Sequence, residues 1–223
     1  MAQVTIIGAG LAGSEAALQL AKCGINIDLY EMLPNKTTGA HKTEKFAEFV
    51  CSNSMGSSDP TNASGLLKKE MEILGGELIK IAINCSVPAG NALAIDREGF
   101  ANTVTEKIYS NPYINVINEE ITEIPKDKNV IIASGPLTSD SLADSIKDFT
   151  QNEHLHFFDA IAPIIEKESI NFDKAFYASR YNKGEASYIN CPMSKEEYER
   201  FYNFLINAPR IELKEFEKNA KFF

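Results

Sequence analysis

The sequence contains no tryptophan and only three histidines, and its four cysteines are widely scattered. The cysteines are Cys23, Cys51, Cys85 and Cys191. Because no two of them form a C-x-x-C pair and histidines are so few, the pattern predicts no metal site. We expect free thiols in a reducing compartment, where most free cysteines are small buried hydrophobic residues.

Long apolar runs are also absent. No stretch approaches the roughly 20 apolar residues that span a bilayer. No basic segment precedes the first apolar run at residues 4–7, as it would in a signal peptide. We therefore expect a cytoplasmic protein with no membrane partner.

Positive charge is in short supply, since 22 Lys and Arg against 31 Asp and Glu give a net charge of −9. Nucleic-acid binding usually shows as a basic patch, so this charge argues against a surface that is basic throughout and leaves a local patch open. With 44% hydrophobic and 24% charged residues, the 223 residues are ordinary for one large domain, or for one domain and part of another.

What the chain does have is a strand, a glycine turn and a helix at its beginning. Residues 4–7 are a β-branched run, and residues 14–23 predict a helix that ends at Gly24. A second strand is predicted at residues 25–30 and is followed by Glu31, which stands 31 − 13 = 18 positions after the last glycine of the turn. The turn consists of Gly8, Ala9, Gly10, Leu11, Ala12 and Gly13. This order predicts a βαβ unit of the dinucleotide-binding type.

Each part of this unit has a physical task. Gly8 allows the sharp turn, Gly10 leaves room for a pyrophosphate, and Gly13 lets the helix pack closely on the sheet. Phosphates would meet unpaired N–H groups at the helix N-terminus. Glu31 can accept hydrogen bonds from both ribose hydroxyls and disfavours a 2′-phosphate. We therefore expect the six turn residues and Glu31 to bind FAD or NAD(H) rather than NADP(H), with a ligand-free glycine turn as the alternative.

Loops and helices follow up to about residue 111. A turn-rich segment leads to a short predicted helix at residues 42–49 and then to a loop in which the Cys51 thiol precedes three small polar residues. Asn62 or Ser64 is expected to cap a helix that ends at residues 75–76, and residues 77–84 are ambiguous between helix and strand. Asp96 is expected to cap the next helix.

A strand or hairpin is predicted at residues 114–124, followed by a second strand at residues 129–133 and a helix at residues 139–149. The second strand runs into Ser134-Gly135-Pro136. A strand that ends in glycine lies at the carboxyl edge of a doubly wound sheet, where ligands bind. Gly135 is therefore a second candidate cofactor contact, or else an ordinary turn glycine.

The pattern changes near residue 150. Short aromatic strands are predicted at residues 154–158, 161–165, 175–179 and 186–190. Ser194 and Glu197 form a capping box for a helix that runs to about residue 207. We predict an α/β protein in which residues 1–150 are the first part of a Rossmann-like doubly wound domain, and residues 151–223 begin an inserted, strand-rich α+β domain.

Eight stretches carry a resemblance to a known family. They are Val4–Ala17, Asp28–Met32, Cys51–Ser54, Ser86–Gly90, Leu93–Arg97, Asn118–Ile124, Ser134–Ser139 and Tyr188–Met193. Together they resemble the bacterial folate-dependent tRNA (uracil-5-)-methyltransferases over nearly the whole chain. The glycine motif is shared by countless flavoproteins, whereas the thiol loop and the Pro-Ala-Gly to Asp-Arg stretch are specific.

The resemblance implies an FAD enzyme that takes a methylene from methylenetetrahydrofolate, reduces it with NAD(P)H and places a methyl on C5 of a uracil in the T-loop of tRNA. Uracil C5 is a poor nucleophile until something adds at C6 or builds up enolate character, so such enzymes employ thiols. Cys51 matches a functional cysteine of the family and is the catalytic candidate, with simple burial as the alternative. Basic residues that could meet RNA phosphates, or be ordinary surface, are Lys42, Lys45, Lys68, Lys69 and Arg97.

The chain also departs from the family. A second family cysteine, in a Glu-Gly-Cys motif, follows a stretch like Lys214–Phe223, where this sequence stops. We therefore expect these residues alone to be inactive as a methyltransferase and poor at retaining FAD. His41-Lys42 stands where family members often have two histidines, and we assign this pair no catalytic role.

Three alternative functions remain open from the sequence. One is a paralogue that methylates ribosomal RNA, and another is a flavin- or nucleotide-binding module without transferase activity. A third is the related flavoprotein of wobble-uridine modification, which the Cys51–Ser54 loop disfavours. Oligomeric state is left open.

Overall fold

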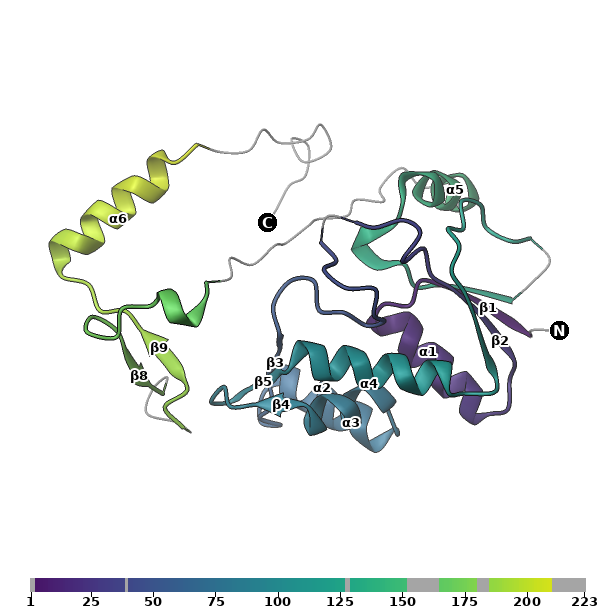
Figure 1. Cartoon of the computed structure of the whole chain (residues 1–223), viewed down its shortest axis with the longest axis horizontal. Coiled ribbons are helices and arrows are strands. Elements are labelled where there is room, and N and C mark those ends of the chain that lie inside the picture. The colour runs from purple at the N-terminus through teal and green to yellow at the C-terminus, as the bar shows by residue number, and fades with distance from the viewer. Residues whose placement is uncertain (1–2, 39, 127–128, 152–164, 180–184, 210–223) are drawn as a thin grey trace. The chain divides into compact units, whose positions relative to one another are not determined.

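The computed structural model describes residues 3–38, 40–126, 129–151, 165–179 and 185–209 (Figure 1). The chain divides into two compact units, Met1–Ile164 and Ile165–Phe223. The boundary predicted near residue 150 stays a prediction. The strand predicted at residues 154–158 and most of the one at 161–165 lie outside the described residues.

Parallel strands form the main sheet of the first unit, in the order β6-β2-β1-β7. Their bounds are β1 Val4–Ile7, β2 Ile27–Tyr30, β6 Ile114–Ile117 and β7 Asn129–Ile132. Ile7, the last residue of β1, pairs with Tyr30 of β2 and Ile132 of β7. The carboxyl ends of these three strands therefore lie at one edge of the sheet, which is where parallel α/β sheets bind ligands.

Helices lie on both sides of this sheet. Those beside the sheet are α1 Leu11–Lys22, α4 Arg97–Tyr109 and α5 Asp140–Thr150, while α3 Glu77–Asn84 packs on α1 and α4. The fully buried Phe100, Val104 and Ile108 of α4 lie at i, i+4 and i+8 and join the core with Ile6 and Leu29 of the strands. In Figure 1, α5 lies on the opposite side of β1 and β2 from α1. The predicted Rossmann-like α/β class is confirmed.

A small antiparallel sheet, which the sequence did not reveal, precedes α4. Its strands are β3 Ser54–Ser57, β4 Ser86–Val87 and β5 Ala92–Ile95, in the order β3-β5-β4, and α2 Ala63–Ile73 packs on β3. The β3 residues, Ser-Met-Gly-Ser, carry almost no apolar alternation, so the pattern gave little sign of a strand. Residues 77–84 resolve as helix α3.

Two other local predictions were wrong. Residues 42–49 form turns rather than a helix, because the Ala47 N–H donates to the Ala9 carbonyl at 2.9 Å and the Phe46 N–H donates to Thr105 Oγ1 at 3.0 Å. The strand or hairpin predicted over residues 114–124 is a single strand that ends at Ile117. In the first case, contacts distant in sequence override the local pattern.

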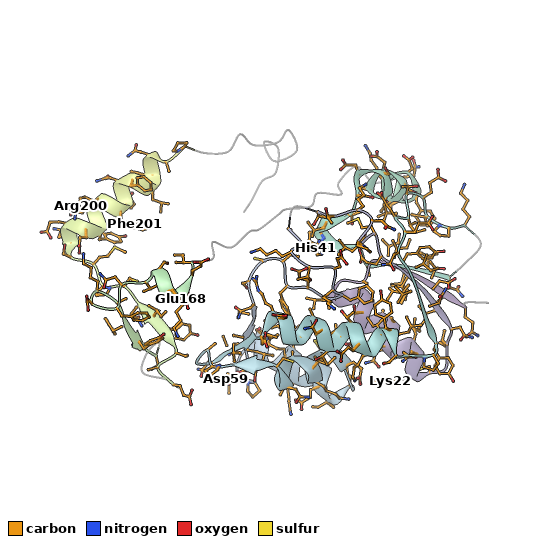
Figure 2. All side chains as sticks on the ribbon, viewed as in Figure 1. Lys22, His41, Asp59, Glu168, Arg200 and Phe201 are labelled. Carbon is orange, nitrogen blue, oxygen red and sulfur yellow. The ribbon has the colours of Figure 1, made fainter. Side chains whose placement is uncertain are left out.

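The described part of the second unit includes a pair of antiparallel strands and a helix. Strands β8 Phe176–Ala178 and β9 Tyr188–Asn190 pair antiparallel, and α6 spans Lys195–Asn207. Its predicted capping box is confirmed, since Ser194 Oγ accepts from the Glu197 N–H and the Glu197 carboxylate accepts from the Ser194 N–H. Phe201 of α6 is exposed (Figure 2). Within the described residues, none of the helices is both long and apolar enough to cross a membrane.

Candidate functional site

A cavity of about 480 Å³ lies at the carboxyl edge of the main sheet. The glycine turn, the end of β2, the thiol loop and the segment after β7 all contribute to its wall. The predicted site residues that line it are Gly8, Gly10, Leu11, Ala12, Glu31, Cys51 and Gly135. The fold thus brings together residues that are more than 100 positions apart in the sequence.

The three glycines of the turn differ in what surrounds them. Gly8 has a φ of 97°, and a Cβ on it would lie 2.8 Å from the Ala133 carbonyl oxygen. A Cβ on Gly13 would lie 1.8 Å from the Gly8 carbonyl oxygen, whereas one on Gly10 would meet nothing within 4 Å. Gly8 and Gly13 are therefore required by contacts within the chain, while Gly10 borders open space of the kind that a phosphate group needs.

Glu31 is held by two backbone groups. Glu31 Oε2 accepts from the Ala9 N–H at 2.7 Å, and Oε1 accepts from the Leu33 N–H at 3.2 Å. Since an ionised carboxylate has about four acceptor positions, each oxygen retains capacity for a ribose hydroxyl. Ala9 and Gly13 do not line the cavity. They support it, Ala9 by orienting Glu31 and Gly13 by close packing.

The N-terminus of α1 faces the same cavity. The Ser14 N–H donates to the Gly10 carbonyl, and no side chain caps the helix at Gly10. The N–H groups of Leu11, Ala12 and Gly13 therefore have no acceptor within the helix. Unpaired N–H groups at the positive end of a helix dipole are suited to an anion. These residues fit the pyrophosphate and ribose of an adenine dinucleotide.

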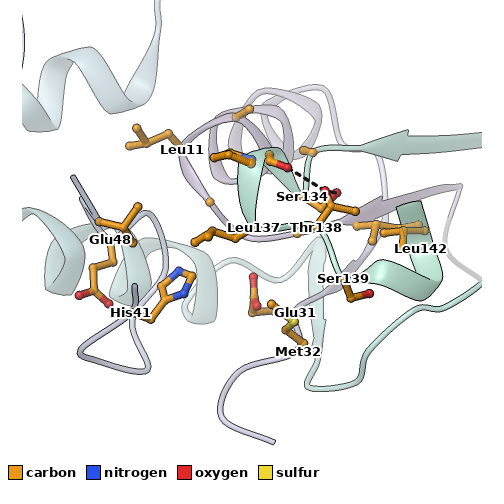
Figure 3. Close-up of a pocket in the computed structure, with 18 of the residues that line it drawn as sticks. Leu11, Glu31, Met32, His41, Glu48, Ser134, Leu137, Thr138, Ser139 and Leu142 are labelled. Atoms are coloured by element: carbon orange, nitrogen blue, oxygen red, sulfur yellow. Dashed lines mark hydrogen bonds between the residues drawn. The ribbon is translucent and has the colours of Figure 1, made fainter. Parts of the chain in front are cut away.

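The segment after β7 forms another part of the wall. Gly135 has a φ of 63°, and a Cβ on it would meet nothing within 4 Å. The Ser134 and Thr138 hydroxyls are hydrogen-bonded at 2.7 Å (Figure 3). This bond closes a tight turn at Gly135–Leu137, with Gly135 in the left-handed region that favours glycine. A cofactor contact by Gly135 stays a prediction.

Cys51 is exposed and lines the cavity from an irregular loop. Its carbonyl accepts from Nη2 of Arg97 at 2.6 Å. Two further basic residues that the sequence offered as RNA contacts are also engaged, Lys68 with the Ser64 hydroxyl at 2.7 Å and Lys69 with Glu72 at 2.8 Å. Partial burial lowers the pKa of Lys68.

His41 is a cavity residue to which the sequence assigned no role. Its Nδ1 lies 2.7 Å from Thr38 Oγ1, and its ring lies between Glu31 and Glu48 in the view of Figure 3. The sequence gave two signals, a turn-rich stretch after Glu31 and the two histidines that family members often have at positions 41 and 42. Neither placed His41 in the cavity, because tertiary contacts position this loop. Across the described ranges, no group of three or more His, Cys, Asp or Glu residues is placed to hold a metal ion.

Comparison with known proteins identifies the family. The sequence profile of the family described as Glucose inhibited division protein A (GIDA) matches residues 3–223. The chain belongs to the GIDA family.

Relatives of this GIDA-family chain carry a more specific name. It is 56% identical over 219 residues to a protein from Bacillus licheniformis and 57% identical over 220 residues to one from Fusobacterium nucleatum. Both are named methylenetetrahydrofolate–tRNA-(uracil-5-)-methyltransferase TrmFO. The matches cover 98% and 99% of this chain but 50% and 51% of the relatives. The chain therefore spans about half the length of these curated relatives.

Solved structures include a more distant match. GidA from Aquifex aeolicus is 19% identical, with a TM-score of 0.48, and the match covers 60% of this chain and 25% of that one.

Proposed function

We propose that this chain supplies the adenosine side of an FAD site and the reactive thiol of a folate-dependent tRNA (uracil-5-)-methyltransferase. The observation that carries the proposal is that Cys51, Gly10 and Glu31 line one cavity. The names of relatives that are 56–57% identical over almost all of the chain support it independently. These names specify tRNA, so we propose tRNA rather than ribosomal RNA as the substrate.

The chain's part in holding the cofactor follows from the geometry. The first-turn N–H groups of α1 would bind the pyrophosphate beside Gly10, and Glu31 would accept the ribose hydroxyls. Gly135 would border the same ligand. Bound flavin supplies the redox chemistry that carries electrons from NAD(P)H to the methylene taken from methylenetetrahydrofolate. The site, the reductant, the folate and a cytoplasmic location are all parts of the proposal.

Cys51 would act on the uracil. A thiolate can add to C6, which builds enolate character at C5; once C5 has bonded to the one-carbon unit, loss of the C5 proton to a base expels the thiolate. Alternatively, a thiolate can itself accept the C5 proton. Its neighbours Ser52 and Ser54 also line the cavity and are small, which leaves room for a base beside the thiol.

A fused protein tests the proposal. Residues 1–223 of this chain would replace the matching half of the Bacillus subtilis relative, to which the chain is 56% identical. We expect the purified fusion to hold flavin and to form 5-methyluracil in a tRNA transcript when given methylenetetrahydrofolate and NADH. The Cys51→Ala form should keep its flavin and lose at least about 100-fold in rate.

Two controls accompany this assay. Visible absorbance and circular dichroism show whether each fusion is folded and loaded with flavin, and a ribosomal RNA fragment is assayed beside the tRNA. A folded, flavin-loaded fusion that methylates neither RNA contradicts the proposed function. One that methylates only the ribosomal fragment contradicts the choice of tRNA, and unchanged turnover in Cys51→Ala removes the thiol from the chemistry.

A further inference from the structure

The thiol loop is attached to one short segment of the chain at three places. Phe49, before the thiol, packs edge-to-face on Phe100, with ring centroids 5.2 Å apart. Asn53, after the thiol, exchanges two hydrogen bonds with Ile95: the Ile95 N–H donates to the Asn53 carbonyl at 2.9 Å, and Asn53 Nδ2 donates to the Ile95 carbonyl at 3.1 Å. Both contacts are made to residues at the junction between β5 and α4.

Arg97 makes the third attachment, at the thiol residue itself. Cys51 lies in irregular backbone, where no strand ladder holds its carbonyl, and the guanidinium donates to that carbonyl at 2.6 Å. A hydrogen bond from a charged donor is stronger and more directional than one between neutral groups. Residue 49 thus contacts residue 100, residue 51 contacts residue 97, and residue 53 contacts residue 95. These three contacts hold the loop antiparallel to the segment 95–100.

The base of this attachment is rigid. Ile95 and Phe100 are fully buried, and Asp96 caps α4 by accepting from the N–H groups of Glu98 and Gly99. Arg97 is the first residue of α4, where a positive charge opposes the helix dipole. The position is thus unfavourable for the helix itself but favourable for reaching Cys51.

We infer that Arg97 is a positioning residue, whose guanidinium fixes the Cys51 carbonyl and so sets where the thiol lies in the wall of the cavity. The inference rests on the proposed role of Cys51. The sequence offered Arg97 either as an RNA contact or as ordinary surface, and its bond to the Cys51 carbonyl gives the side chain a role within the chain.

Hydrogen exchange on the 223-residue chain, without flavin or RNA, tests this inference. Arg97→Met removes the donor, Arg97→Lys keeps a charged donor, and Glu98→Gln is a matched change at the next position of the same helical turn. We expect Arg97→Met to raise exchange in the peptide covering residues 50–54 by about fivefold or more, while the core of α4 is unchanged. Arg97→Lys should restore most of the protection, and Glu98→Gln should match the parent.

A second measurement is the rate at which the Cys51 thiol is alkylated. Iodoacetamide labelling followed by peptide mass spectrometry gives the rate at Cys51, with the exposed Cys23 and Cys191 as references in the same sample. We expect the Cys51 rate, relative to these references, to change at least about threefold in Arg97→Met and to recover in Arg97→Lys.

Unchanged exchange and labelling in Arg97→Met would overturn the inference. So would a rise in exchange that is equal in α4 and the loop, because Arg97 would then support general stability alone. A failure of Arg97→Lys to recover either signal would show that a charged donor is not what holds the loop. None of these readouts depends on methyl transfer, so the inference and the proposed function can fail separately.

Discussion

At the scale of single residues, Gly10 and Gly13 differ in the space that surrounds them. The space beside Gly10 is open, whereas the space beside Gly13 is already occupied by the Gly8 carbonyl. Packing of α1 on β1 therefore explains Gly13, whereas the open space beside Gly10 is the basis for proposing a ligand there, and the two cases can be separated by experiment.

Gly13→Ala should destabilise the chain, while Gly10→Ala should not. Because the methyl group added by Gly13→Ala would overlap backbone atoms, we expect a loss of at least about 1–3 kcal/mol in the free energy of unfolding. Gly10 has an ordinary φ of −67° at the start of α1, so Gly10→Ala should stay within about 0.5 kcal/mol of the parent. Urea unfolding of the two variants measures this. Equal stability of both variants would contradict the close packing of α1 on β1 at Gly13.

At the scale of elements, Glu77 joins three helices. It begins α3 and pairs with Lys22 of α1 at 2.6 Å and Lys107 of α4 at 2.7 Å, while Lys80 lies 3.5 Å away (Figure 2 labels Lys22). Partial burial raises the pKa of Glu77, but hydrogen bonds and charges from Lys107 and Lys22 outweigh it and lower the pKa to about 2. Glu15 of α1 also accepts from the first N–H groups of α3.

The pKa of Glu77 predicts an acid-sensitive contribution to stability. A folded-state pKa below the ordinary 4.5 means that the contribution is present above pH 4.5 and is lost as pH falls toward 2. After screening of the half-exposed lysines by solvent, we expect it to be about 1–2 kcal/mol. Glu77→Gln should lose this amount at pH 7 in urea unfolding and show less change between pH 5 and 2.5.

Glu72→Gln is the matched control, because its i,i+3 pair with Lys69 is exposed and should contribute little. If Glu77→Gln and Glu72→Gln unfold at the same urea concentration at pH 7, the three-helix network does not stabilise the fold.

Local signals explain which elements the sequence predicted well. Asn62, Asp96 and Ser194 cap their helices as expected, because a cap depends on residues two or three positions away. The turns at residues 42–49 depend instead on Ala9 and Thr105, which lie far away in the sequence. No local pattern encodes such partners.

At the scale of the whole molecule, the site also combines features that nearby residues determine with features that depend on residues far away in the sequence. The glycine turn and Glu31 form one βαβ unit and could be predicted from spacing. Gly135 could be placed at the same edge of the sheet because a predicted strand ends just before it. Cys51 was a candidate through the family resemblance, and its place in the cavity depends on the path of its loop. His41 lining the cavity and Arg97 bonded to the Cys51 carbonyl emerge only from tertiary structure.

The central claim is that the glycine turn and Glu31 bind the adenosine and pyrophosphate of a dinucleotide beside Cys51. Amide chemical shifts of the 223-residue chain during titration with ADP test it most directly, since ADP carries those groups alone. We predict saturable shifts at residues 8–13 and at Glu31, and their loss in Gly10→Val. Adenosine 2′,5′-bisphosphate should bind about tenfold more weakly than adenosine 5′-monophosphate, because Glu31 repels the 2′-phosphate. Shifts confined to other residues, or ADP binding that Gly10→Val leaves unchanged, would contradict the claim.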